Sequence, residues 1–432
     1  MAVKFLIYTV ILILYVVKPT IALLCFPIAY ILISRKQRIG KAFISGIILS
    51  LPLSFINIFG GSYDNFPLSW YNLFCIAYIL YESFNKLKFS YHSGTLIIVA
   101  LLGVFALSTI LSYDPSISIK SLLTTGVTCV VLLFFLCNYY LEKYSNEDLQ
   151  MYRTQYIVAL CSIGVSMLTL KVLFLFGIEF SNSGIMDVGG GRIGNRFLFT
   201  DFSFLSIFLS TGVAYCLFIK FENKWIQTII CLLLLWACIE TTARSGLVAL
   251  LIFVFLFFVK KFLSTQKVKY LIIIAPFLFI SVIAVNVLNN RRNSKQAITD
   301  GSGRIENIIN SMVAIKENPF FGVGPGAKVY RNYIENEHGV VDNYEIPHNI
   351  IFQMLVYYGM VGLIILSLFF IYLIINRKDT PEYNMFYVCV IGAFFVPDIF
   401  VSRFFLVMIL LMWMSRTCDS GIFTFKVTKK IK

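Results

Sequence analysis

Residues 300–362 read DGSGRIENIINSMVAIKENPFFGVGPGAKVYRNYIENEHGVVDNYEIPHNIIFQMLVYYGMVG. The stretch holds a polar loop with an isolated arginine on an amphipathic turn, then a glycine-rich elbow. A Pro-His-Asn motif follows, placed directly before a long apolar run. Because the sequence on both sides is a series of apolar runs, we expect a membrane scaffold around one chemically rich loop.

Composition places the chain among membrane proteins. Hydrophobic residues make up 59% of the 432 residues and charged residues only 13%, whereas soluble domains have about a quarter charged residues. Apolar runs near the roughly 20 residues needed to cross a bilayer recur along the whole length. We therefore predict an all-α polytopic integral membrane protein. The net charge of +14 is explained by basic cytoplasmic loops, so no nucleic-acid partner is expected.

The apolar runs predict 12 to 14 transmembrane helices in a single membrane domain of residues 1–432. The segments lie at about 3–17, 20–34, 40–58, 69–84, 94–112, 119–141, 154–177, 197–220, 225–239, 245–263, 270–288, 347–375, 384–398 and 402–415. Lys18-Pro19 interrupts the first pair and Pro397-Asp398 the last pair. Because proline disrupts a helix without always ending it, each pair is either two short helices or one kinked helix.

The distribution of charge predicts the orientation. Lysine and arginine are concentrated in cytoplasmic loops of membrane proteins. With a cytoplasmic N-terminus, most lysines and arginines of this chain lie on the inner side, including those of the basic tail. We therefore expect both termini inside. The large loop of residues 289–346, with a short amphipathic helix within it, is then extracytoplasmic.

In this orientation, four predicted helices run inward from the outer face and begin beside a basic residue or a histidine. Those residues are Arg192 and Arg196, Arg244, His348, and Arg403. Helix N-termini carry unpaired N–H groups and the positive end of the dipole, and they favour anions. The guanidinium fork also matches phosphate oxygens. The pattern predicts a phosphate or diphosphate site at the outer face.

Arg304 begins the segment RIENIINSMVAIK, whose apolar residues recur at helical spacing. The spacing predicts a short helix on the outer membrane surface, ended by Asn318-Pro319. Gly322, Gly324 and Gly326 then allow a tight elbow. Arg304 is a candidate anion ligand, and the alternative is an ordinary interfacial arginine.

His348 is one of three histidines and the one placed at the start of an outer helix. Imidazole titrates near neutrality and can remove a proton from a sugar hydroxyl, so His348 is a candidate general base. The alternative is an interfacial histidine that only forms hydrogen bonds. His338 in the polar loop is a rival base, whereas His92 is expected on the cytoplasmic side.

For Arg244, Arg403 and Lys171 the sequence offers alternatives to a role in a site. Arg244 lies between two apolar runs, where charge is costly and usually functional or paired, and Glu240 is one turn away. Arg403 has Asp398 nearby in the same way, and Lys171 is interpreted as a snorkelling side chain. The glycine-rich segment 189–196 has no predicted strand before it, which excludes a dinucleotide-binding turn.

No metal site or cofactor is expected from the sequence. It contains no Asp-x-Asp motif and no cluster of histidines and cysteines with metal-ligand spacing. The ten cysteines are scattered through apolar runs without a CxxC pair. This distribution is typical of packed thiols, not of a metal site or a disulfide framework.

Four short motifs occur in one order around the large loop. They are TTARSG at 241–246, GRIEN at 303–307, NPFFGVGPG at 318–326 and PHNIIFQMLVYYGMVG at 347–362. In these motifs the chain resembles the O-antigen ligase and O-antigen polymerase superfamily, over roughly residues 185–405. These are membrane enzymes that transfer glycans from a polyprenyl diphosphate carrier. The resemblance implies a fold like that of the GT-C glycosyltransferases, a bacterial inner membrane location and an active site that faces the periplasm.

The same resemblance implies the roles of individual residues. Arg244 and Arg304 are expected to hold the carrier diphosphate, and His348 is expected to activate the acceptor hydroxyl. Candidate further contacts to the substrate are Arg192, Arg196, Arg403 and Asn349. The implied reaction is displacement at the anomeric carbon without a metal. The implied partners are the polyprenyl-diphosphate-linked oligosaccharide, as donor and acceptor, and a protein that regulates chain length.

The acceptor distinguishes the two activities of the superfamily. The residues His348-Asn349-Ile350, where ligases often have His-Asn-Glu, and the intact GVGPG elbow favour a polymerase of surface polysaccharide repeat units. A ligase that joins the glycan to lipid A–core is the alternative. A flippase for lipid-linked glycans is a third interpretation, but the sequence has no self-similar halves, which transporters often have.

Overall fold

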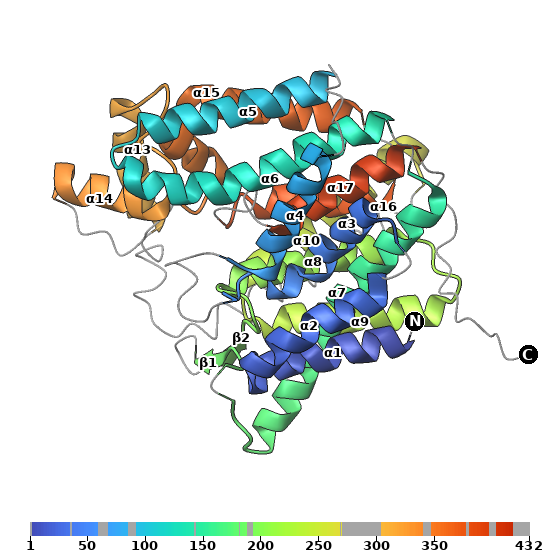
Figure 1. Ribbon diagram of the computed structural model, residues 1–432. Helices are drawn as coiled ribbons and strands as arrows, with labels where there is room; N and C mark the ends of the chain where they lie inside the picture. Colours follow the sequence, from blue (N-terminus) through green and yellow to red (C-terminus); the bar gives the residue numbers. More distant parts are fainter. Residues whose placement is uncertain are drawn as a thin grey trace, which may run out of the picture.

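The computed structural model describes residues 2–34, 37–58, 68–84, 92–141, 144–180, 182–187, 193–267, 269, 304–339, 347–376, 380–396 and 403–417. These residues form a bundle of helices with one short β-hairpin (Figure 1). Five helices are long and apolar enough to cross a membrane, and further apolar helices are shorter. The predicted class, an all-α multi-pass membrane protein, is confirmed.

The helices follow the predicted apolar segments. They are α1 (Ala2–Val17), α2 (Pro19–Ser34), α3 (Ile39–Leu49), the 3₁₀ helix η1 (Leu51–Leu53), α4 (Trp70–Phe84), α5 (Ser93–Ile110), α6 (Pro115–Leu141), α7 (Asn146–Leu175), α8 (Phe202–Phe218), α9 (Lys224–Glu240), α10 (Arg244–Thr265), α15 (Ile350–Ile375), α16 (Pro381–Gly392) and α17 (Arg403–Thr417). The predicted segment 270–288 lies outside the described residues.

The two uncertain pairs are separate helices. α1 and α2 meet at Lys18 and pack against each other. α16 and α17, near the other end of the chain, also pack against each other. The interpretation of each pair as one kinked helix is therefore wrong. At the first pair the reason is that Pro19 has no N–H group with which to continue the hydrogen bonding of α1.

α7 begins at Asn146, not at residue 154 as predicted. A capping box starts it, in which the Ser145 hydroxyl accepts from the Asp148 N–H at 3.2 Å. The earlier start carries Arg153 into the bundle, where its Nε lies 2.7 Å from Glu382 Oε1 of α16. The Tyr215 hydroxyl of α8 also donates to this carboxylate, at 3.2 Å. Arg153, expected in a cytoplasmic loop, is therefore half of a buried ion pair.

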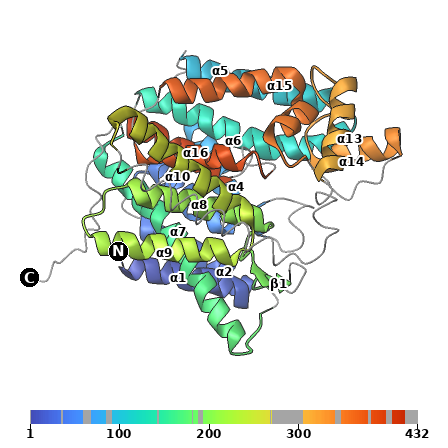
Figure 2. The same ribbon diagram turned by 180° about the vertical axis from the view of Figure 1, so that it is seen from behind.

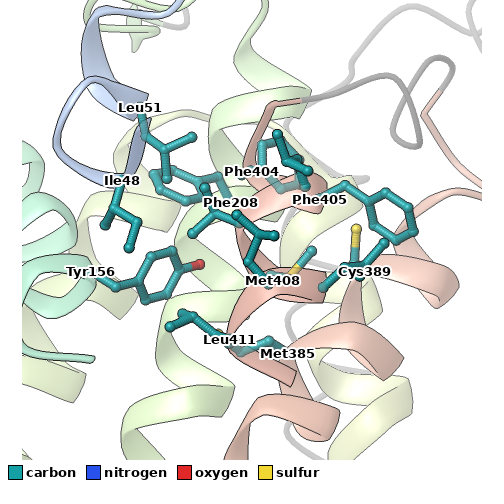
Figure 3. Close-up of a cluster of buried hydrophobic side chains, with 14 of the residues drawn as sticks. Ile48, Leu51, Tyr156, Phe208, Met385, Cys389, Phe404, Phe405, Met408 and Leu411 are labelled. Carbon is teal, nitrogen blue, oxygen red and sulfur yellow. The ribbon is translucent and has the colours of Figure 1, made fainter. Parts of the chain in front are cut away.

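α8 and α17 lie at the centre of the bundle. Both are apolar around their whole circumference, and such helices are stable only when other helices surround them. Between Leu205 and Cys216 every side chain of α8 is buried, and α17 is buried from Arg403 to Ser415. Figure 3 shows Phe208 of α8 and Phe404, Met408 and Leu411 of α17 gathered in one hydrophobic cluster. Other labelled members come from α3, η1, α7 and α16.

Two paired strands flank the glycine-rich residues 188–192, which lie outside the described residues. Strand β1 (Ile185–Asp187) pairs with strand β2 (Ile193–Asn195) in antiparallel register, with Met186 opposite Gly194. The prediction that no strand precedes these glycines is wrong. The dinucleotide interpretation still fails, because a second strand follows the glycines where a binding turn needs a helix.

Two further helices lie at one side of the bundle. They are α13 (Arg304–Glu317) and α14 (Ala327–His338). Both views show them at the side opposite the N-terminal end of α1, together with the β-hairpin (Figures 1 and 2). This side is called the loop side below. α13 occurs where the sequence predicted a short helix, whereas α14 was not predicted.

Candidate functional site

Three successive residues of α8 connect the elements that carry the predicted site residues. The Ser206 hydroxyl donates to the Ala243 carbonyl oxygen at 3.1 Å, directly before Arg244. Ile207 packs so closely on Gly392 that a Cβ atom there would lie 2.8 Å from Ile207 Cδ1. The ring of Phe208 lies 5.3 Å from that of Phe404, next to Arg403. The first turns of α8 thus join the starts of α10 and α17 to the end of α16.

The start of α15 joins the same group of elements. The Ile350 N–H donates to the Ala393 carbonyl oxygen at 3.0 Å, so the chain at His348 lies beside the end of α16. Asn349 is the N-cap of α15, and its side-chain oxygen accepts from the Ile351 N–H at 2.9 Å. This contact gives Asn349 a structural role that the sequence analysis did not assign. His348 precedes the cap and is partly exposed.

Arg244 begins α10 after a strained turn. Thr242 has a φ of +58°, a conformation that β-branched residues rarely adopt. The Thr241 hydroxyl braces this turn, since it donates to the Cys238 carbonyl oxygen at 2.7 Å. It also accepts from the Ala243 N–H at 3.3 Å. Arg244 is partly exposed at the end of this turn.

The carboxylate of Glu240, considered above as a partner for Arg244, has an ion pair with another cation. Its Oε2 lies 3.1 Å from Lys171 Nζ at the end of α7. Lys171, interpreted as a snorkelling side chain, therefore has an acidic partner on a neighbouring helix. Sequence spacing along one helix does not reveal such a partner.

Arg196 follows the β-hairpin, and its side chain is held by the chain that leads into α8. Its Nη1 donates to the Thr200 carbonyl oxygen at 2.9 Å. Phe197, the next residue, has a φ of +50° and donates its N–H to Asn195 Oδ1 at 2.8 Å. Arg192, the other arginine predicted here, lies outside the described residues.

Arg403 is buried at the start of α17 against aromatic rings. Its guanidinium carbon lies 4.4 Å from the ring centre of Phe55 and 6.0 Å from that of Tyr71. Phe55 in turn packs on Phe199, with 5.2 Å between ring centres. Ring faces hold a guanidinium without carrying an opposite formal charge. Asp398, considered as its partner, lies outside the described residues.

The glycine-rich elbow fits against a kink in α15. Gly359 interrupts this helix with a φ of +63°, and the Met360 N–H donates to the Pro319 carbonyl oxygen at 2.8 Å. A Cβ atom at Gly322, whose φ is +70°, would lie 2.3 Å from the Val356 carbonyl oxygen. The Val323 N–H donates to that same oxygen at 2.7 Å. The elbow therefore needs glycine for both its backbone angles and its close approach.

The elbow also contacts the turn between α5 and α6. The Val323 carbonyl oxygen accepts from the Tyr113 N–H at 2.9 Å and from the Ser112 hydroxyl at 3.2 Å. These contacts hold α13 and α14 against the loop-side ends of α5, α6 and α15. Arg304 is the first residue of α13, which places its backbone on the loop side, but its side chain lies outside the described residues.

His338, the rival base, is held by acidic and aromatic neighbours. Its Nε2 lies 3.2 Å from Glu317 Oε2 at the end of α13. The Tyr333 hydroxyl donates to the same carboxylate and accepts from Asn318 Nδ2 at 3.2 Å. The hydrogen bond from Tyr333, followed by the interaction with His338, lowers the pKa of Glu317. Burial raises the pKa of Tyr333. We call Glu317, Tyr333 and His338 the loop clasp.

The strained positions are a signal that sequence reasoning missed. Thr242 and Phe197 both have positive φ and lie within two residues of Arg244 and Arg196. Such strain is concentrated at functional sites when the surrounding structure enforces it. No residue type at these positions marks it in the sequence. Among the described residues, no group of three histidine, cysteine or acidic side chains could hold a metal ion.

A comparison with protein families covers this part of the chain. Residues 229–367 match the family model described as O-antigen ligase. The match includes the start of α10, α13, the elbow and the start of α15 with His348. No curated protein matches the chain. Residues 229–367 are therefore similar to the O-antigen ligase family, and the predicted resemblance to the O-antigen ligase and polymerase superfamily is confirmed.

Proposed function

We propose that the protein is a polymerase of surface polysaccharide. It would join oligosaccharide repeat units that are carried on a polyprenyl diphosphate in the bacterial inner membrane. The loop side would face the periplasm. The family match supports a membrane enzyme of the glycosyltransferase type. The identities of the donor and of the acceptor are part of the proposal.

One observation carries the proposal. The family match runs from α9 to α15 and contains Arg244, Arg304 and His348. Contacts of α8 and α16 bring the starts of α10 and α15 to the same group of elements on the loop side. Helix starts offer N–H groups and the positive end of the dipole to an anion. We place the diphosphate at these helix starts and His348 beside it as the base.

In the proposed reaction His348 takes the proton from a hydroxyl of the acceptor sugar. The oxygen then attacks the anomeric carbon of the donor from the face opposite the diphosphate. The bond from this carbon to the diphosphate oxygen breaks, and the configuration inverts. Arg244 and Arg304 would bind the charge that develops on the leaving diphosphate, where fixed cations lower the barrier most. The helix starts would position the two substrates.

Arg403 would act at a greater distance from the reacting atoms. The ring faces of Phe55 and Tyr71 hold its guanidinium at the start of α17. Arg196, which follows the β-hairpin, and Arg192, which lies outside the described residues, would be further contacts to the substrate. Asn349 would position the chain at His348, because its side chain caps α15.

A ligase is the second candidate, since the matched family is described as O-antigen ligase. Both activities need the same donor site, and they differ in the acceptor. The residues His348-Asn349-Ile350 and the GVGPG elbow favour the polymerase. A protein that regulates chain length would be a partner of the polymerase only.

Reconstitution of the purified protein with a synthetic lipid-linked repeat unit tests the proposal. A polymerase lengthens the glycan on its carrier without any other acceptor. Transfer that requires added lipid A–core would show a ligase. Movement of the substrate across the bilayer without a new glycosidic bond would show a transporter and contradict the proposal.

A further inference from the structure

α13 is packed with its polar face inward. The side chains of Asn307 and Ser311 are 2% and 0% exposed. The Ser311 hydroxyl donates to the Asn307 carbonyl oxygen at 2.6 Å and lies 3.3 Å from the Tyr330 hydroxyl of α14. The interface between the two helices is therefore built from polar groups that satisfy one another, as buried polar groups must.

The outward face of α13 carries large apolar side chains between the exposed Glu306 and Lys316, and it is called the apolar face below. Ile309 and Met312 are 57% and 54% exposed, and Phe320, directly after the helix, is 67% exposed. Ile309, Met312 and the exposed Lys316 follow one another at helical spacing. A helix with water on its outer face would have the opposite arrangement. α14 has that opposite arrangement, since Val329 and Ile334 are buried and Asn336 is exposed.

The apolar face of α13 continues the exposed stripe of α15. Met360, Ile364, Leu368, Ile371 and Ile375 form this stripe on a helix that is long and apolar enough to cross the membrane. The Val361 N–H donates to the Phe320 carbonyl oxygen at 3.3 Å, so Phe320 lies beside Met360, the first residue of the stripe. The exposed side chains of the elbow and of α15 therefore face the same medium.

The position of Phe320 along α15 identifies those surroundings. α15 rises about 22 Å from Met360 to Ile375 at about 1.5 Å per residue. The hydrocarbon core of a bilayer is about 30 Å thick. With Ile375 at the inner edge of the hydrocarbon core, Met360 and the neighbouring Phe320 lie about 22 Å from that edge. This depth is within the outer part of the core. The irregular backbone of the elbow is covered by α15 and by the α5–α6 turn, as non-helical backbone at this depth must be.

We propose that α13 is an interfacial anchor that lies in the loop-side leaflet of the bilayer. Ile309, Met312 and Phe320 contact lipid acyl chains, and Lys316 extends toward the phosphate groups. The Asn307 and Ser311 face stays within the protein. The partner of this surface is the phospholipid bilayer, and neither water nor a second protein chain covers it.

Photo-crosslinking from single positions tests this inference. p-Benzoylphenylalanine is placed at position 309, 312 or 320, and the full-length protein is reconstituted in phospholipid vesicles. Position 364 on the stripe of α15 is the control for lipid contact, and position 336 on α14 is the control for water contact. All five side chains are exposed, so the replacement disturbs no packed contact. Substitution of Phe320 is also the most conservative.

Illumination should add the mass of one phospholipid at positions 309, 312, 320 and 364, and leave position 336 without a lipid adduct. An adduct at position 364 without one at 309, 312 and 320 would overturn the inference. Crosslinks from these three positions to a second copy of the chain would overturn it as well. The vesicles contain no glycan donor, so the result does not depend on whether the protein is a polymerase.

Discussion

The two histidines of the loop side lie in opposite settings. His338 ends α14, and its imidazole faces Glu317 in the loop clasp. His348 precedes the N-cap of α15, at a helix start that the end of α16 contacts.

The difference shows what the fold adds to residue type. Both histidines occur in the same polar stretch of the sequence, and either could serve as a base by its chemistry alone. The clasp uses His338 to join the end of α13 to the end of α14. His348 lies instead beside the end of α16, a helix that packs on α8 and α10. We therefore expect large effects on turnover at His348 and small effects at His338.

The largest effect is expected for His348→Ala. Loss of a general base lowers the rate by about 10²–10⁴-fold, and the rate of chain extension in proteoliposomes measures this loss. His338→Ala is the matched control and should extend chains at close to the normal rate. The opposite result, with a large loss only in His338→Ala, would exchange the roles of the two histidines.

Arg244 is expected to show the next largest effect, and it tests the anion site near His348. A hydrogen bond to a charged group contributes about 1.5–3 kcal/mol, so Arg244→Ala should lower turnover by about 10- to 150-fold. Arg244→Lys should restore part of this loss, because a lysine keeps the charge but not the two-pronged geometry. Arg331→Ala on α14 is a control, since Arg331 pairs with Glu335 of its own helix. Equal turnover in Arg244→Ala and Arg331→Ala would contradict a diphosphate site at Arg244.

The glycine-rich elbow gives a third test, which measures the stability of the fold. In Gly322→Ala the new Cβ atom would lie 2.3 Å from the Val356 carbonyl oxygen. The left-handed backbone alone costs about 1–2 kcal/mol for an alanine, and the clash adds to this. The melting temperature in detergent should fall clearly.

Gly339→Ala is its control, because Gly339 also has a positive φ, of +65°, but open space around it. The difference between the two variants measures the close approach to α15. Equal melting temperatures would show that the elbow does not pack tightly there.

The smallest effect is expected for the loop clasp itself. The hydrogen bond from Tyr333 and then the charge of His338 lower the pKa of Glu317. A carboxyl group whose pKa is lowered by folding stabilises the protein above its unfolded pKa, about 4.3. This contribution is lost as the pH falls through the lowered value in the folded protein. Glu317→Gln should therefore flatten the acid side of the melting profile slightly, and an unchanged profile would contradict the clasp.

Several elements of the fold follow from local sequence. The apolar runs predicted most helices within a few residues, because length and composition determine which segments can cross a bilayer. The segment predicted at 40–58 is an exception, since α3 ends at Leu49 and the short η1 follows. Asn318-Pro319 correctly marked the end of α13, since proline cannot continue a helix. α7 was predicted to start too late, because its first residues are charged. The burial of Arg153 in this helix depends on Glu382, which is distant in the sequence.

The candidate site was predicted only as a set of residue types. The motifs pointed to Arg244, Arg304 and His348, but the contacts that join the starts of α10 and α15 to α8 and α16 cannot be read from them. Asp398 was considered as a partner of Arg403, and the contacts with the rings of Phe55, after η1, and Tyr71 of α4 were not foreseen. The strain at Thr242 is also invisible in the sequence.

The amino-acid order by itself determined that this chain is a membrane protein built from helices around one polar loop. It did so because hydrophobic length and helix-ending residues act locally. Only the tertiary structure decided which charges neutralise each other, which histidine is held by a carboxylate, and which face of α13 points outward. Those outcomes depend on neighbours from distant parts of the chain, and burial changes the free energy of a charge or a polar group far more than its local sequence does.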